Sequence, residues 1–152
     1  MKKISAFIIL LMIGGAVFAQ GKAPLSKGEK QLNFGIGFDG GVPVYAGIDY
    51  AVHDDITIGG NIGFDLTGFD YMNLTVRGDY HWNRLIGIPD NWDFYAGVNF
   101  GGAIGLSRYY GNGLHVDIHV GGRYYWDEKW GINLELGGGT GFASSLGVSM
   151  KL

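Results

Sequence analysis

The segment His115-Val-Asp117-Ile-His119 places three side chains of metal-ligating type at alternate positions. In a β-strand these side chains share one face, with neighbours about 6.6 Å apart. His115 with Asp117, or Asp117 with His119, could share an ion, whereas the two histidines, about 13 Å apart, could not do so directly. The sequence shows no second ligand set with matching spacing. We therefore expect polar residues of a hydrated or hydrogen-bonded interior, and we assign no metal site.

Ser107 is the candidate nucleophile nearest in the sequence to His115 and Asp117. A serine, a histidine and an acid perform nucleophilic catalysis when the serine and the histidine lie within hydrogen-bonding distance. Ser107 falls in a predicted loop, and the pattern does not fix its distance to His115. We assign no catalytic residue.

Gly35-Ile-Gly37-Phe-Asp-Gly40 matches the G-x-G-x-x-G pattern of dinucleotide-binding loops. In those proteins a helix follows the glycines. Here the residues from Pro43 onward continue with the alternating spacing of a strand. The glycines are therefore interpreted as part of a strand, and no cofactor is expected.

The elements that carry these residues are strands, because apolar or aromatic residues recur at every second position from Lys30 to Leu152. Leu74, Val76 and Tyr80, for example, share one face, and polar residues share the other. Eight such segments predict an all-β protein, an eight-stranded antiparallel up-and-down transmembrane β-barrel. The predicted strands cover residues 31–39, 43–52, 56–65, 71–82, 92–106, 114–126, 130–137 and 142–152.

The apolar face carries no charged side chain in any of these segments. A basic side chain facing lipid at the membrane midplane costs about 2 to 4 kcal/mol, so a bilayer selects against it. A soluble eight-stranded barrel with its apolar face inward would show the same alternation. Its water-facing side would be rich in Lys and Glu, whereas this polar face is mainly Gly, Asn, Thr and Asp. Small residues suit a narrow interior, which favours the transmembrane barrel.

Aromatic residues gather near the strand ends, as amphipathic rings do at the headgroup level of a membrane. At one end we predict an interface girdle of Tyr50, Tyr80, Trp82, Trp92, Phe94, Tyr124, Trp126 and Trp130. A second band at the other end would consist of Phe38, Phe64, Phe69, Tyr71, Tyr109, Tyr110 and Phe142. The two bands would enclose one aliphatic belt.

Charged residues on the polar face are predicted to form a structural network in the lumen, because an unpaired charge inside a protein is costly. A hairpin turn at 127–129 sets Glu135 opposite Gly121. Glu135 is then diagonal to Arg123 and His119, and these groups can reach one another. The whole predicted network consists of Asp49, Arg77, Asp79, Asp117, His119, Arg123, Glu135 and Lys151.

The first residues have the features of a secretory signal peptide: a basic start, a short apolar stretch from Ile8 to Ile13, and small residues before a cut after Ala19. We predict a signal peptide over 1–19, a flexible periplasmic tail over 20–29, and the barrel over 30–152. The cleaved chain would carry nine basic and fourteen acidic residues, a formal charge of −5, which argues against nucleic acid as a partner. The chain has no cysteine to carry a lipid or a disulfide.

An even number of strands places both termini at one side, which the signal peptide makes the periplasm. The turns at 53–55, 83–91 and 127–129 would then be periplasmic. Residues 83–91 are more than such a turn usually contains. The loops near 40, 67, 110 and 140 would face outside.

The carboxyl end, Leu146-Gly-Val148-Ser-Met150-Lys-Leu152, alternates up to its last residue. It resembles the terminal strand of small outer-membrane β-barrels of Gram-negative bacteria, of the OmpX kind and the OmpA transmembrane-domain kind. Nearly all of the chain after residue 19 shares the resemblance, although the family usually ends in Phe or Trp. The resemblance implies a monomeric integral protein of the bacterial outer membrane. Its implied partners are outer-membrane lipids, lipopolysaccharide and, during assembly, the outer-membrane insertion machinery.

Three functions remain open for such a barrel. The one we predict is a mainly structural or surface-interaction role, because eight strands leave an interior just wide enough for side chains to fill. The first alternative is a small-solute pore. The second is a lipid A-modifying enzyme, an activity that the resemblance includes but for which the sequence shows no assembled site.

Overall fold

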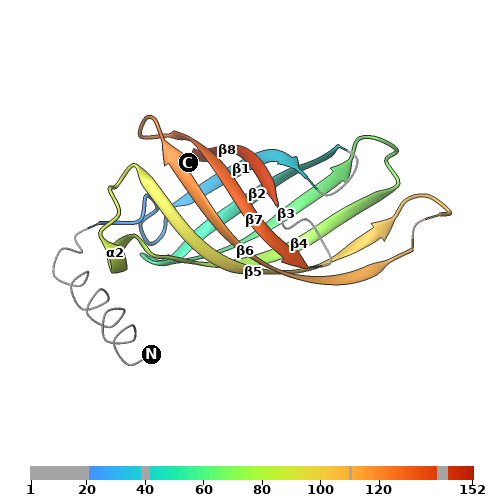
Figure 1. Cartoon of the computed structure of the whole chain (residues 1–152), viewed down its shortest axis with the longest axis horizontal. Coiled ribbons are helices and arrows are strands. Elements are labelled where there is room, and N and C mark those ends of the chain that lie inside the picture. The colour runs from blue at the N-terminus through green and yellow to red at the C-terminus, as the bar shows by residue number, and fades with distance from the viewer. Residues whose placement is uncertain (1–20, 39–41, 110, 140–143) are drawn as a thin grey trace, which may run out of the picture.

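The computed structural model describes residues 21–38, 42–109, 111–139 and 144–152. They form eight antiparallel strands in which each strand pairs with its sequence neighbours and β1 pairs with β8, so the sheet closes into a barrel (Figure 1). The predicted fold class is confirmed. The strands are β1 (Lys30–Gly37), β2 (Pro43–His53), β3 (Ile56–Asp65), β4 (Tyr71–His81), β5 (Trp92–Gly105), β6 (Gly113–Tyr125), β7 (Trp130–Gly139) and β8 (Ser145–Lys151).

Some predicted features lie outside the described residues. These are the signal peptide over 1–19, the end of the first strand at 39, the start of the last strand at 142, and the rim residues Tyr110 and Phe142. The last strand is described from Ser145. No helix among the described residues has the length and apolarity needed to span a membrane.

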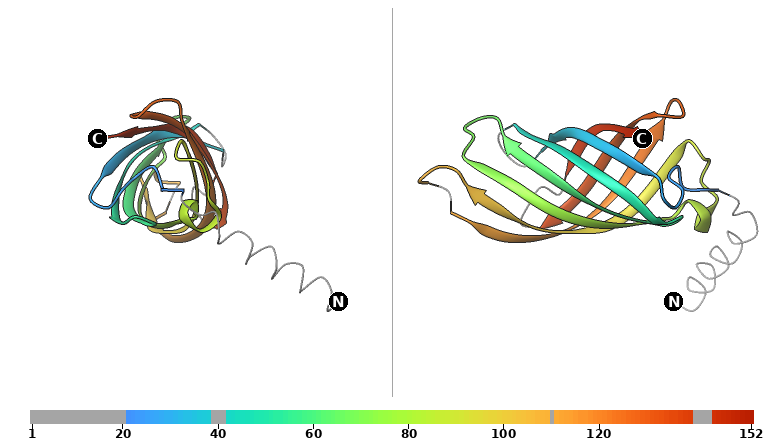
Figure 2. Two further views of the ribbon diagram at one scale, coloured as in Figure 1. Left: turned by 90° about the vertical axis from the view of Figure 1, so that its left-hand side faces the viewer. Right: turned by 180° about the vertical axis from the view of Figure 1, so that it is seen from behind.

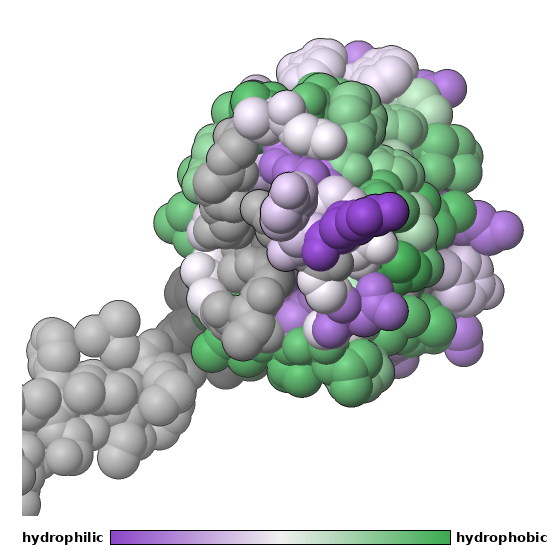
Figure 3. Space-filling model, turned by 90° about the vertical axis from the view of Figure 1, so that its right-hand side faces the viewer, coloured by the Kyte–Doolittle hydropathy of each residue, from purple (hydrophilic) through white to green (hydrophobic). Residues whose placement is uncertain are grey.

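The alternating residues divide between the two surfaces of the barrel. Outward side chains are apolar and exposed, and Val76 in the middle of β4 is 61% exposed. Inward side chains are polar and buried, including Arg77 and Arg123. In the view of the loop end, hydrophobic residues cover much of the circumference, and hydrophilic residues lie near the middle and at parts of the edge (Figure 3). This distribution is the reverse of that in a soluble protein, in which apolar groups fill the interior.

The long turn at 83–91 contains a short helix, α2 (Asn83–Ile86), which accounts for its length. Gly87 ends the helix in the left-handed conformation with φ 66°, a geometry that glycine adopts without steric cost. α2 lies at the end of the barrel that also carries the hairpin between β6 and β7 (Figure 1). We call this end the α2 end and the opposite one the loop end. Trp82, predicted in a strand, instead directly precedes α2.

Residues 21–29, for which the sequence predicts a flexible tail, make specific contacts with the barrel. They run across the mouth of the barrel at the α2 end (Figure 2). Ala23 and Leu25 are each only 3% exposed. The backbone N–H of Gly28 donates to Ala51 O at 2.8 Å. Two isolated apolar residues anchor this segment, and two isolated residues form no periodic pattern in the sequence.

Candidate functional site

An ion pair connects non-adjacent strands across the lumen. Arg77 on β4 donates from Nη2 to Glu135 Oε1 on β7 at 2.7 Å. The same guanidinium donates from Nε to Asp79 Oδ2 at 3.0 Å. All three side chains are buried. The pair therefore links opposite sides of the barrel wall in a place where each charge needs a partner.

Arg123 on β6 makes a second cross-lumen connection. Its Nη2 donates to Asp49 Oδ2 on β2 at 3.0 Å, and its Nη1 donates to Asp93 Oδ2 on β5 at 3.1 Å. Asp49 Oδ2 also accepts hydrogen bonds from the side-chain amides of Gln31 and Asn33, each at 2.9 Å. Arg77 Nε lies 3.8 Å from the other oxygen of Asp49, which joins the two arginine clusters.

His81 lies between Thr57 and Asp93, with its Nε2 3.0 Å from Thr57 Oγ1 and its Nδ1 2.7 Å from Asp93 Oδ1. Hydroxyl, imidazole and carboxylate in this order form the arrangement of a catalytic triad. All three residues are no more than 2% exposed, so a substrate does not reach the hydroxyl in this conformation. The arrangement serves to orient and satisfy buried polar groups.

Tyr95 is the aromatic centre of the network and is completely buried. Its hydroxyl donates to Glu135 Oε1 at 2.7 Å. The guanidinium carbon of Arg123 lies 4.1 Å from the ring centroid, close enough for a cation–π interaction. Gly121 on β6 provides the space for this ring, because a Cβ there would lie 2.3 Å from Tyr95 Cζ.

The lumen contains more buried acids than arginines. Apart from Asp55 and Asp65 at the barrel rims, the buried acids among the described residues are Asp49, Asp79, Asp93, Asp117 and Glu135. The buried arginines among them are Arg77 and Arg123. Five carboxylates and two guanidiniums give a net charge of −3. Three histidines, His81, His115 and His119, are buried on the same inner face.

The predicted network residues all face the lumen, but their contacts differ from those predicted. The register pairs Glu135 with Gly121, as predicted from the hairpin. Glu135 bonds with Arg77 and Tyr95, whereas we predicted Arg123 and His119 as its partners. His119 instead lies 2.9 Å from Asp79 Oδ1 through its Nε2.

Two further members of the predicted network lie at different depths. Asp117 is buried in the interior. Lys151 lies at the mouth of the α2 end, with its Nζ 4.2 Å from the ring centroid of Tyr125.

The sequence interpretation did not assign several residues that complete the network: Gln31, Asn33, His81, Asp93, Tyr95 and Tyr125. The signal that could have found them is their position in the alternation. Asp93 and Tyr95 flank Phe94, an outward residue, and must therefore point inward. A buried tyrosine has a hydroxyl that needs a hydrogen-bond partner, and the polar side chains of the lumen provide one.

The candidate chemical groups near the loop end do not assemble into a site. His115 Nε2 lies 3.4 Å from Thr75 Oγ1. Ser107 Oγ is buried and makes no hydrogen bond, so Ser107 and His115 do not form a nucleophile–base pair. Across the described part of the chain, no group of three or more His, Cys, Asp or Glu side chains is arranged to hold a metal ion.

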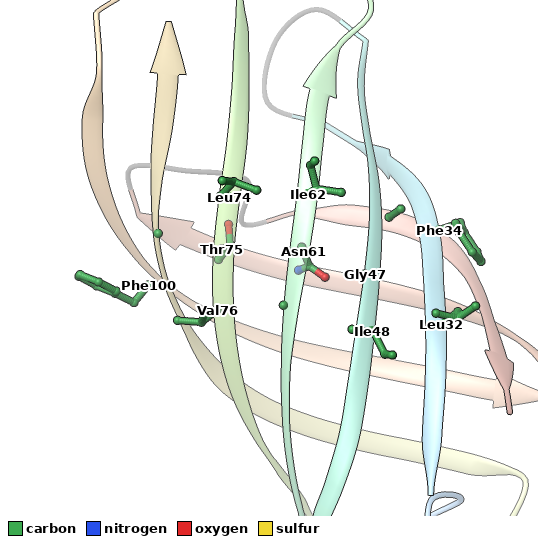
Figure 4. Close-up of a pocket in the computed structure, with 13 residues that line it drawn as sticks. Leu32, Phe34, Gly47, Ile48, Asn61, Ile62, Leu74, Thr75, Val76 and Phe100 are labelled. Carbon is green, nitrogen blue, oxygen red and sulfur yellow. The ribbon is translucent and has the colours of Figure 1, made fainter.

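The outer wall has apolar hollows between its side chains. One of about 820 Å³ lies over β1 to β5, where small Gly60 leaves a gap among larger residues. Its labelled apolar side chains, such as Leu74, Ile48 and Phe34, project from the outer side of the strands (Figure 4). In the lumen, by contrast, a cavity beside Asn99 and Glu135 measures about 30 Å³, enough for one or two water molecules.

The predicted girdle residues are placed around the α2 end on the outer surface. Tyr50, Tyr80, Trp92, Phe94, Tyr124, Trp126 and Trp130 are exposed there, and Trp82 is half-buried. Trp92 stacks on Phe94 with 5.8 Å between ring centroids and contacts Tyr124 at 4.8 Å.

Solved structures of low sequence identity share this architecture. The N-terminal β-barrel domain of Pseudomonas aeruginosa OprF superposes with a TM-score of 0.68 at 15% identity, over 84% of this chain and all of that one. The fold is that of the small outer-membrane β-barrels. Yersinia pestis Ail, an outer membrane protein, gives a TM-score of 0.54 at 12% identity over 83% of this chain and all of that one.

A barrel from the de novo design of transmembrane β-barrels gives a TM-score of 0.66 at 16% identity over 84% of this chain and 98% of the designed one. No protein-family model and no curated protein matches the sequence. The resemblance to barrels of the OmpA and OmpX type is thus shown at the level of fold. Fold alone does not assign an activity, so function must be argued from the lumen and the surface.

Proposed function

We propose that this chain is an integral protein of the bacterial outer membrane with a closed lumen and a mainly structural or surface-interaction role. The α2 end would face the periplasm and the loop end the exterior. The continuous uncharged outer belt supports the membrane location, since side chains such as Val76 and Ile118 would otherwise expose a large apolar surface to water. The barrel is proposed to act as a monomer.

The two cross-lumen connections are the observation that supports a closed lumen. Arg77 links β4 to β7, and Arg123 links β6 to β2 and β5. A solute passing through would have to separate these buried charges, and breaking one buried pair costs about 3 to 5 kcal/mol. This arrangement favours a structural barrel over the small-solute pore.

The proposed partners are outer-membrane lipids, lipopolysaccharide and the insertion machinery during assembly. In the described part of the loops at the loop end, Arg108 is the one basic residue. Clustered basic residues are the usual means of binding phosphate groups. We therefore propose that lipopolysaccharide contacts the barrel mainly through acyl chains along the apolar belt.

Planar-bilayer recording of the purified protein tests the closed lumen. The expected result is an absence of discrete openings over long recordings. Openings of constant size would instead support the pore. Arg123→Met, which removes one cross-lumen connection, serves as a comparison: if both proteins remain silent, other side chains also seal the lumen.

Incubation of the protein with lipid A tests the enzyme alternative. We expect no altered lipid species, because Ser107 and His115 are not paired. A modified lipid that disappears in Ser107→Ala would overturn the proposed non-catalytic role.

A further inference from the structure

The turn that contains α2 differs in chemistry from the other two turns at the same end. The turn between β2 and β3 contains Asp54 and Asp55, and that between β6 and β7 contains Asp127, Glu128 and Lys129. On α2, in contrast, Leu85 is 60% exposed and Ile86 is 59% exposed. The other turns at this end carry charged residues at such exposed positions. An exposed apolar pair here therefore indicates a contact with an apolar phase.

The α2 helix is held in a fixed position. Asn83 is fully buried, and its Nδ2 donates to Trp92 O at 2.6 Å. Arg84 forms an ion pair with Asp55 on the neighbouring turn. Ile88 is buried, and its N–H donates to Asn83 O at 3.1 Å. The turn therefore has an inner apolar residue packed against the barrel and a rigid outer apolar pair.

The backbone of α2 is joined to Trp82, a residue at the edge of the outer surface of the barrel. Its N–H groups donate to Trp82 O, at 2.9 Å from Leu85 and 3.1 Å from Ile86. Trp82 and Trp92 line an outward hollow of about 710 Å³ that continues along β5 to β8. α2 lies at the rim of the wall on the side of β4 and β5 (Figure 2). The pair thus lies between the ends of β4 and β5, beside the apolar outer belt.

We propose that α2 is an interfacial anchor whose Leu85 and Ile86 insert into the headgroup–acyl boundary of the inner leaflet around the barrel. This inference rests on the proposed membrane function and adds a specific lipid contact to it. The occupant is the phospholipid bilayer itself, because short amphipathic segments beside Trp residues bind at this depth. Arg84 and its partner Asp55 keep the polar side of the turn toward water.

A site-specific fluorescence experiment tests the anchor. The chain has no cysteine, so single substitutions carry a single NBD label. The labelled variants are Ile86→Cys, Val76→Cys in the middle of the belt, and Glu128→Cys on the charged turn at the same end. Each is refolded into vesicles of phosphatidylethanolamine and phosphatidylglycerol, and heat-dependent gel mobility verifies folding. Iodide quenches labels in water, and lipids brominated near the top of the acyl chain quench labels at the boundary.

We expect iodide to quench the label at position 86 several-fold less than the label at 128, and the brominated lipid to quench it several-fold more. Equal iodide quenching at 86 and 128, with 76 protected, would overturn the anchor and leave the membrane barrel intact. Strong iodide quenching at 76 as well would overturn the proposed function. Leu85→Cys repeats the measurement at a second exposed site, so the test does not depend on the folding of one variant.

Discussion

Arg77 and Glu135 lie 2.7 Å apart across the lumen, although their strands, β4 and β7, are not neighbours in the sheet. Contacts of this kind connect parts of the wall that backbone hydrogen bonds do not connect. Tyr95 adds a second donor to the same carboxylate oxygen. Glu135 therefore joins Arg77 and Tyr95 through a single carboxylate oxygen.

Replacing Glu135 with Gln is expected to destabilise the barrel by about 3 kcal/mol, because Arg77 would lose a buried counter-ion. The measurement is the free energy of unfolding in urea, with the barrel in vesicles. Glu128→Gln is the matched control, since Glu128 lies on an exposed turn and its replacement should have no effect. Equal stability of both variants and the natural protein would contradict the structural role of the pair.

Gly121→Ala is expected to destabilise the barrel by about 1 to 3 kcal/mol. The new Cβ would lie 2.3 Å from Tyr95 Cζ, and the buried ring has no free space to move into. Gly78→Ala provides the control, because a Cβ there meets no atom within 4 Å. Thermal loss of the folded gel band measures both. If the two variants melt together with the natural protein, Tyr95 is not fixed by this contact.

The sequence predicts the strands and their pairing because a period of two residues is a strong local signal. The same alternation could have placed Tyr95 and Asp93 inside, although the predicted network includes neither. It does not predict that Glu135 bonds with Arg77, since contacts between non-adjacent strands depend on the tilt and closure of the barrel. It also misses α2, which is too short to show helical periodicity, and the anchoring of residues 21–29.

Leu25→Ser is expected to release the N-terminal segment without unfolding the barrel. Burial of a leucine side chain contributes about 2 kcal/mol, which corresponds to roughly thirtyfold in a local opening equilibrium. Trypsin cleavage after Lys22 and Lys27 should accelerate by about that factor. Glu128→Ser, which changes an exposed side chain at the same end, should leave the rate unchanged. Rapid cleavage of the natural protein would show that the segment is not anchored.

Asp127 should protect the hairpin between β6 and β7 against acid. Its carboxylate accepts hydrogen bonds from the N–H groups of Lys129 at 2.7 Å and Trp130 at 2.6 Å, which lower its pKa from the ordinary 3.8. The stabilisation is therefore complete above the unfolded pKa and is lost as the pH falls through the lower folded pKa. NMR shifts of the two amides should titrate with a midpoint below 3.8. Asp127→Asn should abolish this titration, and a midpoint at or above 3.8 would contradict the turn geometry.

The apolar outer wall of the barrel is proposed to face a membrane. Fractionation of cells that produce the full chain, followed by gel electrophoresis with and without heating, tests it most directly. We predict that the protein appears in the outer-membrane fraction and migrates differently before and after heating, because the closed barrel resists detergent until it is boiled. A soluble protein whose mobility is unchanged by heating would contradict the claim.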